Sequence, residues 1–143
     1  MRADEILGYC GLYCGGCGTY QATAAGGGIE YEPGFSTTCR GCNSNELSIW
    51  CSDCEIKDCA REKGLRYCLE CEEFPCEKSR GFMDDARYPY HRDVPELMAR
   101  LRRVGLETWA EEQRQKWICE SCGSEFDWLS QQCPGCGAAV NVR

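Results

Sequence analysis

One cysteine pattern occurs twice in the middle of this chain, and both copies have the spacing C-x2-C-x4-C. The two copies consist of Cys51, Cys54 and Cys59 and of Cys68, Cys71 and Cys76. A tight turn between thiols two residues apart lets both sulfurs reach one metal ion at about 2.3 Å. Three thiols leave a tetrahedral ion one ligand short, so each copy must borrow or share a ligand. The pattern predicts a metal cluster, or two coupled sites, built by both copies.

Cysteine is unusually frequent, with 15 residues in a chain of 143. Such a density is typical of a disulfide framework or of a metal framework. Residues 1–5 include charged side chains, and no apolar run follows that would serve as a signal peptide or membrane span. We therefore expect a cytoplasmic protein. In that reducing setting C-x2-C pairs favour metal binding, and the odd number of Cys argues against a closed set of disulfides.

The charge of the chain narrows the choice of partners. The formal net charge is −7, with every thiol counted as neutral. Metal-bound Cys is a thiolate, so the loaded protein is more acidic still. This weighs against a nucleic-acid backbone as ligand, and the basic residues Arg100, Arg102 and Arg103 fit a solvated helix face. We expect a protein partner and neither a membrane nor a nucleic-acid partner.

Two cysteine pairs near the N-terminus, Cys14 with Cys17 and Cys39 with Cys42, have nearly the spacing of a four-thiol zinc module. Cys10 remains outside this set. The C-x3-C-x2-C run that starts at Cys10 also holds the iron–sulfur cluster of radical S-adenosylmethionine enzymes. Those enzymes need most of a large α/β barrel, for which this chain has neither the length nor the βα alternation. A cluster completed by a further thiol, such as Cys59 or Cys76, remains an alternative.

The clearest helical signals lie in the last third of the chain. Asp93 followed by Glu96 is typical of an N-cap with its capping-box partner. An apolar stripe at helical spacing then continues to the next glycine, which ends the helix. A second helix is predicted over residues 106–116, and Trp109 and Trp117 fall on one face of it.

Further upstream, the signals are shorter. Residues 19–25 are rich in Ala and Thr and predict a short helix, which the glycines at 26–28 end. Residues 30–38 contain Pro33 and Gly34 and are predicted as a loop.

The last part of the chain holds the strongest single motif, two C-x2-C-G turns. Its four cysteines are Cys119, Cys122, Cys133 and Cys136. This arrangement predicts a zinc ribbon, with a strand over residues 125–129 that places Phe126 and Trp128 on one side. A rubredoxin-like iron site would use similar turns. Zinc is favoured because the ribbon is short and nothing nearby indicates an electron-transfer partner.

The 15 Cys and the single histidine, His91, would satisfy four tetrahedral ions. In one scheme Cys10 or His91 completes each C-x2-C-x4-C copy. In a second, the six central Cys form a two-zinc cluster that resembles the fungal binuclear motif, although its third spacing is x4 and not x6. A third pairs the first two Cys of each copy and needs neither Cys59 nor Cys76. His91 is otherwise interpreted as a hydrogen-bonded surface or core residue.

Three strings together resemble a known family. They are Cys10-Gly-Leu-Tyr-Cys14, Cys39-x-Gly-Cys42 and Glu-Phe-Pro-Cys76. The resemblance is to short, cysteine-rich, predicted metal-binding proteins of bacteria and archaea classed as a domain of unknown function, and it covers about the first two-thirds of the chain. It implies a metal-stabilised domain and no particular reaction.

The sequence as a whole predicts a small metal-stabilised α+β protein with three parts. These are a cysteine-rich domain over 1–80, a helical connector over 81–117 and a zinc ribbon over 118–143. We expect three or four zinc ions in structural roles, in an interaction or accessory module and not an enzyme. The alternative is a redox or metal-handling protein with an iron–sulfur cluster at the N-terminal cysteines. The predicted metal ligands are Cys10, Cys14, Cys17, Cys39, Cys42, Cys51, Cys54, Cys59, Cys68, Cys71, Cys76, Cys119, Cys122, Cys133 and Cys136.

Overall fold

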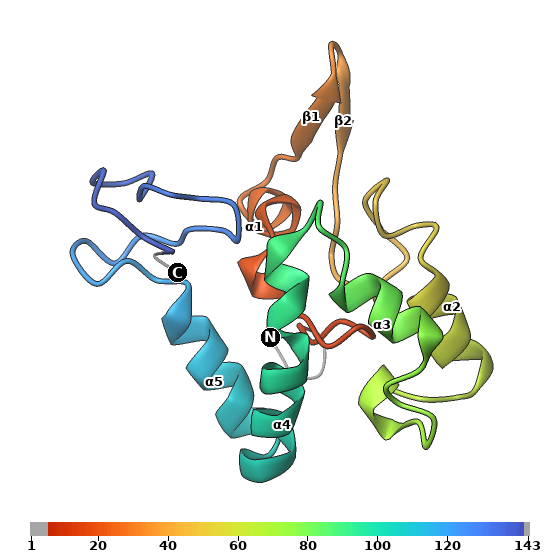
Figure 1. Ribbon diagram of the computed structural model, residues 1–143. Helices are drawn as coiled ribbons and strands as arrows, with labels where there is room; N and C mark the ends of the chain where they lie inside the picture. Colours follow the sequence, from red (N-terminus) through yellow and green to blue (C-terminus); the bar gives the residue numbers. More distant parts are fainter. Residues whose placement is uncertain (1–5, 142–143) are drawn as a thin grey trace.

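The computed structural model describes residues 6–141 and has a small α+β fold (Figure 1). The first five residues and residues 142–143 of the predicted ribbon lie outside this range. The α-helices are α1 (Gly18–Ala24), α2 (Glu55–Glu62), α3 (Glu77–Met83), α4 (Val94–Val104) and α5 (Leu106–Lys116). The strands are β1 (Ile29–Glu32) and β2 (Phe35–Thr37), and short 3-10 helices are η2 (Cys14–Gly16), η3 (Cys68–Glu70) and η4 (Pro89–Asp93).

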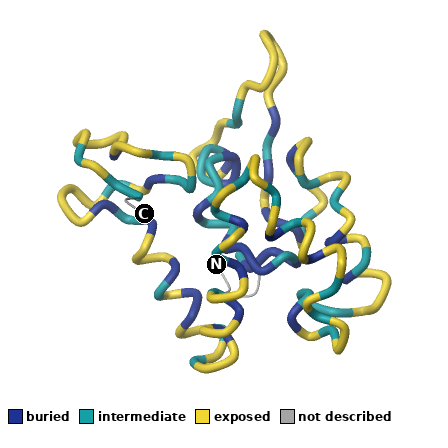
Figure 2. Tube along the Cα trace, in the orientation of Figure 1, coloured by how far each residue is buried: buried dark blue, intermediate teal, exposed yellow. Residues whose placement is uncertain are grey.

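The region predicted as a loop over residues 30–38 is a β-hairpin, so that prediction is wrong. β1 and β2 pair antiparallel, and the two residues between them are Pro33 and Gly34. Proline fixes φ at the first turn position, and Gly34 supplies the positive φ of 81° that the second position needs. Pro33 and Gly34 thus form the turn that connects the two strands, and they do not prevent strand formation. The hairpin projects from the rest of the molecule (Figure 1), and its tip is exposed (Figure 2), with Phe35 60% accessible.

The two helices predicted after residue 93 are confirmed, but the capping box is not. Asp93 makes no side-chain capping hydrogen bond and has helical backbone angles of φ −77° and ψ −14°. A capping side chain needs an extended N-cap residue, whereas η4 continues into α4 without an interruption. Among residues 6–141, no helix combines the length and the apolar composition that a membrane span requires.

The main core forms where α4 and α5 meet the N-terminal segment. Trp109 is fully buried, and its indole N–H donates a hydrogen bond to the Leu97 carbonyl of α4 over 3.0 Å. Trp117 is buried in the same cluster, as the helical spacing of the two Trp predicts. The cluster also includes Leu12 and Phe126, so it draws on all three predicted parts of the chain. The division at residues 80 and 117 stays a prediction.

The predicted strand over residues 125–129 does not form. The ribbon has only the isolated bridges Ile118↔Glu125 and Gln132↔Ala139 within the part of the chain that the structure describes. Its chain turns at Asp127, whose carboxylate accepts the backbone N–H of Leu129 and of Ser130, each at 2.9 Å. An Asp side chain that bonds the backbone two residues ahead makes a turn and competes with strand pairing.

Candidate metal centres

The four C-terminal cysteines converge on one point. The sulfurs of Cys119, Cys122, Cys133 and Cys136 all lie within 4.8 Å of one another. Two of the sulfur–sulfur separations are 3.7 Å, between Cys119 and Cys136, and 3.5 Å, between Cys122 and Cys133. Sulfurs bound to one tetrahedral zinc at about 2.3 Å are roughly 3.8 Å apart, and a disulfide would bring them to about 2 Å. The four free thiols therefore have the spacing of a single-ion site.

Two equivalent turns build this site. The N–H of Gly123 donates to the carbonyl of Cys119 over 2.8 Å, and that of Gly137 donates to the carbonyl of Cys133 over 2.9 Å. Each glycine has a positive φ, 79° and 77°, which a residue with a Cβ rarely adopts. The glycine after each C-x2-C pair thus closes the turn that directs both sulfurs to one side.

Local hydrogen bonds prepare the thiols of this site for metal. Ser124 lowers the pKa of the Cys122 thiol to about 6, and backbone N–H groups, that of Cys122 first, lower the pKa of Cys119. The Ala138 N–H favours the Cys136 thiolate, yet the neighbouring thiols, Cys122 first, raise its pKa to about 11. Metal binding requires thiolates. Without an ion, neighbouring thiolates repel one another, and this repulsion is why the Cys136 thiol keeps its proton.

The site is closed and lies at the surface. Cys119 and Cys133 are buried, while Cys122 and Cys136 are exposed. Four protein thiols complete a tetrahedron and leave no open position for a substrate, which is the arrangement of a structural ion. Within residues 6–141, no other group of three or more Cys, His, Asp or Glu has all its ligand atoms within 4.8 Å of one another.

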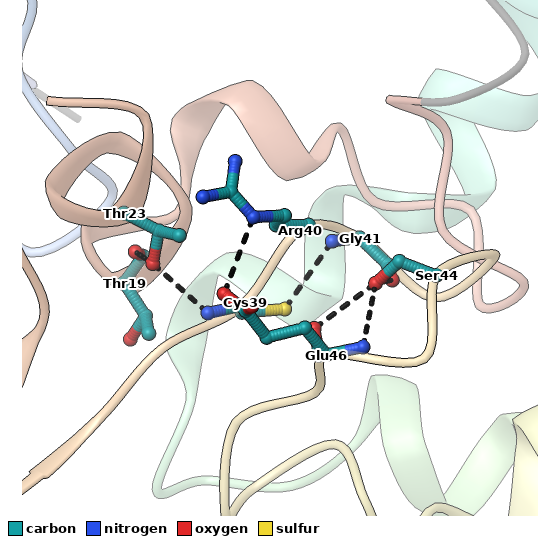
Figure 3. Close-up of polar contacts among 7 residues, drawn as sticks. All are labelled: Thr19, Thr23, Cys39, Arg40, Gly41, Ser44 and Glu46. Atoms are coloured by element: carbon teal, nitrogen blue, oxygen red, sulfur yellow. Dashed lines mark hydrogen bonds and ion pairs between the residues drawn. The ribbon is translucent and has the colours of Figure 1, made fainter. Parts of the chain in front are cut away.

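Cys39 starts a turn that has one hydrogen bond in common with the C-terminal turns (Figure 3). The N–H of Gly41 donates to the Cys39 sulfur over 3.4 Å, as the N–H of Gly135 does to the Cys133 sulfur over 3.3 Å. The Cys39 N–H is held by the Thr23 hydroxyl of α1 at 2.9 Å. The Cys39-x2-Cys42 pair therefore shares this N–H-to-sulfur bond with the C-terminal site, but its positive φ, 97°, lies at Gly41 between the two Cys and not after them.

The thiols around Cys42 form a broader group. Cys14 bonds Cys42, which raises the pKa of Cys14 and lowers that of Cys42. A Cβ on Gly8 would lie 3.3 Å from the Cys10 sulfur and 3.6 Å from the Cys14 sulfur, so both thiols face Gly8. Burial raises the pKa of Cys51 to about 12, and the nearby Cys42 adds to this.

The further members of this group are Cys17, Cys39 and Cys54, which act electrostatically on Cys51 or Cys10. The structure thus places Cys10 and Cys51 near the pairs Cys14–Cys17 and Cys39–Cys42, which the sequence analysis grouped without them.

Cationic side chains that sequence reasoning overlooked lie among these thiols. Lys57 is buried, and its ammonium donates to the Ser52 carbonyl over 2.9 Å. The charges of Lys57 and Arg61 both lower the pKa of Cys42, although its bond with Cys14 has the larger effect. Lys57 follows Cys54 by three positions at the start of α2. Residues at this spacing are neighbours on a helix surface, so the sequence could have identified Lys57.

His91 lies in an aromatic cluster. Its Nδ1 is 3.0 Å from the Phe82 carbonyl, and its ring stacks on Phe82 with centroids 3.7 Å apart. Tyr88 and Tyr90 contact the same ring. Burial lowers the His91 pKa. This placement matches its interpretation as a hydrogen-bonded core residue.

The fold and the C-terminal site together define a small cysteine-rich α+β protein with a potential four-thiol metal site. The sequence model of one family, described as "Protein of unknown function (DUF3795)", matches residues 6–81. This is more than half of the chain, which therefore belongs to that family. The match contains the cysteine repeat and ends before α4, so the four-thiol C-terminal site lies outside it. Searches of curated proteins and of solved structures found no match.

Proposed function

We propose that this protein is a structural zinc-binding protein whose C-terminal thiols hold one zinc ion. The observation that carries the proposal is the convergence of Cys119, Cys122, Cys133 and Cys136 within 4.8 Å. Zinc suits four thiolates in a tetrahedron and needs neither assembly machinery nor a redox partner. A structural zinc of this kind contributes about 10 kcal/mol or more of folding free energy.

This ion orders a segment that has little regular secondary structure. Between Ile118 and Asn141 the described chain has no helix or strand, only isolated bridges. A metal takes the place of a hydrophobic core in such a segment and leaves its surface free for a partner. Leu129, 72% accessible, is the most exposed large apolar side chain of the described residues. We therefore assign the protein an interaction or accessory role, in the cytoplasm, with a protein as its partner.

A second candidate, an iron–sulfur protein, is favoured by the group around Cys42. Its thiols are neighbours but do not all lie within 4.8 Å of one another, and Lys57 and Arg61 place positive charge beside them. A cluster of several metal atoms holds its thiolates further apart than a single ion does, and positive charge stabilises its anionic form.

Metal analysis and a visible spectrum of the full chain, purified without oxygen, test both candidates. We expect a colourless protein with three or four zinc ions, as the spacing of 15 Cys predicts. A brown protein with iron and acid-labile sulfide would replace zinc by the second candidate at the N-terminal thiols. For the C-terminal site, Cys136→Ser should lower bound zinc by one equivalent, and the neighbouring Ser121→Ala should retain all of it. An unchanged zinc content in Cys136→Ser would refute the proposal.

A further inference from the structure

The hairpin of β1 and β2 has no further strand beside it in the described chain. The two strands form a sheet of their own. Outside their mutual pairing, residues 29–36 make no backbone hydrogen bond to the rest of residues 6–141. The hairpin projects from the molecule and is exposed at its tip (Figure 1 and Figure 2). A two-stranded hairpin by itself is at best marginally stable in water, so an added strand would stabilise it.

Most of the exposed large apolar side chains of the described residues lie on this hairpin or at its base. There are five such side chains, and four of them are Tyr31, Phe35, Ile49 and Trp50. Tyr31 and Phe35 belong to the hairpin itself. Ile49 lies at its base, where the Ile49 N–H donates to the Thr37 hydroxyl over 3.1 Å. Aromatic side chains are enriched at protein–protein interfaces, so the hairpin has the composition of an interaction surface.

The charge of this region is one-sided. Glu30 and Glu32 of β1 are exposed, and neither forms an ion pair with another residue of 6–141. Residues 26–53 contain one cation, Arg40, which pairs with Glu46 at 3.3 Å. Four carboxylates against one guanidinium give this stretch a formal charge of −3. Carboxylates beside aromatic rings attract cations both by charge and through the ring faces.

The two strands offer different edges. Glu30 pairs with Ser36 and Glu32 with Phe35, so Tyr31 has no partner and β1 is bulged there. A bulge interrupts the ladder and blunts an edge, which leaves β2 as the regular edge. Directly opposite residues share a face of the sheet, so the Glu32 carboxylate lies with the Phe35 ring on one face. On the other face, the small Ser36 leaves Glu30 within reach of a long side chain from beyond β2.

We propose that this hairpin docks an extended segment of another protein that carries Lys or Arg side chains. The backbone of the segment pairs with the free edge of β2, as in other cases of strand addition. Its cations contact the Glu30 and Glu32 carboxylates and the Phe35 ring. The proposal rests on the interaction role proposed above, to which it gives a surface and a partner chemistry, and it does not depend on the identity of the metal.

A second copy of this chain fits the hairpin less well than a cationic segment does. Its hairpin would bring the same two carboxylates, Glu30 and Glu32, and the whole chain has a formal net charge of −7. Like charges oppose the pairing of sheet edges and the association of the two chains. The phosphates of a nucleic acid would meet the same repulsion. The charge of the hairpin therefore selects a basic protein segment.

Fluorescence anisotropy with the metal-loaded full chain tests the proposal. The probe is a short labelled peptide that alternates Arg and Thr, and a matched peptide carries Glu in place of every Arg. We expect the basic peptide to bind, with an affinity that falls as the salt concentration rises, and the acidic peptide not to bind. Absence of binding by the basic peptide up to millimolar concentration would overturn the proposal.

Substitutions on the hairpin locate the binding. Phe35→Thr and the double variant Glu30→Gln with Glu32→Gln should each weaken the basic peptide about tenfold or more. These side chains are exposed, so both variants should keep the metal content of the wild type. Leu129→Thr is the matched control, because it removes an equally exposed apolar side chain from the C-terminal segment. It should bind like the wild type, and an equal loss of binding in Leu129→Thr would refute the hairpin as the docking surface.

Hydrogen exchange distinguishes strand pairing from attraction by charge alone. With the basic peptide bound, the backbone N–H groups of residues 35–37 should exchange more slowly, and unchanged exchange there would contradict docking on β2. Sedimentation of the chain without peptide should show a monomer. A dimer that Phe35→Thr dissociates would make a second copy the occupant and overturn the proposal. Failure of peptide binding alone would contradict only the hairpin proposal, whereas a wild-type protein without bound metal would contradict the proposed function.

Discussion

The backbone N–H of Trp128 donates a hydrogen bond to the carbonyl oxygen of Gly16 over 3.0 Å. This bond joins the segment with the C-terminal thiols to η2, the turn that starts at Cys14. The Gln21 side chain adds a second connection, because its amide donates to the carbonyls of Gly15 and Phe126 at 2.8 and 3.0 Å. The C-terminal segment is therefore held on the N-terminal part by backbone groups as well as by apolar contact.

Gly16→Ala should loosen this contact. A Cβ at Gly16 would lie 2.3 Å from the indole nitrogen of Trp128 and 3.0 Å from the ring of Trp117. Forcing extra volume into a filled contact costs about 1–3 kcal/mol, and we expect that loss in the free energy of unfolding measured with urea. Gly81→Ala is the control, since its Cβ meets nothing within 4 Å and its helical position favours alanine. Equal stability of Gly16→Ala and wild type would contradict the contact.

Trp109→Ala should be among the most damaging substitutions outside the thiols. The side chain is completely buried and bonds Leu97. Removing a buried Trp leaves a large cavity and costs about 3–5 kcal/mol. Trp50, which is 52% accessible, offers the matched control Trp50→Ala, whose effect on the urea midpoint should be small. Similar losses for both variants would show that Trp109 does not anchor the core.

His91 should make stability depend on pH. Burial lowers its pKa, while the Phe82 carbonyl and the Asp85 carboxylate act in the opposite direction. The unfolded chain therefore takes up a proton more readily than the folded one, with an ordinary pKa near 6.5. The contribution of His91 is complete above that pH and is lost as the pH falls through its lower folded pKa.

The comparison of wild type with His91→Phe isolates this effect from acid release of metal. The stability difference between the two proteins should shift in favour of His91→Phe as the pH is lowered from 7 to 5. A difference that does not change with pH would mean that His91 titrates alike in both states.

Metal removal should begin at the C-terminal site. Cys122 and Cys136 are exposed, whereas Cys39 and Cys42 are buried, so a chelator reaches the C-terminal ion first. With zinc followed by a colorimetric dye, we expect one equivalent to leave in a fast phase, accompanied by alkylation at the C-terminal thiols alone. Fast release from the N-terminal thiols would reverse this order. Trp50→Ala, remote in sequence from the site, should leave the fast phase unchanged.

The sequence by itself determined the parts of this protein that depend on neighbours along the chain. Helices α4 and α5 follow from an apolar stripe and a glycine at residue 105, and the C-terminal thiols follow from two C-x2-C-G turns that close on local backbone bonds. The hairpin was also within reach, because Pro33 and Gly34 form a turn that suits strands as well as loops.

Only the tertiary structure decided which of the N-terminal thiols are neighbours. All eleven have the same chemistry, and C-x2-C spacing fixes pairs without saying which pairs meet. Lys63, at the end of α2, brings its ammonium within 3.4 Å of the Cys71 sulfur, and Cys10 lies by Cys14 because both face Gly8. Such contacts depend on how helices pack across the chain. No periodicity in the sequence encodes them.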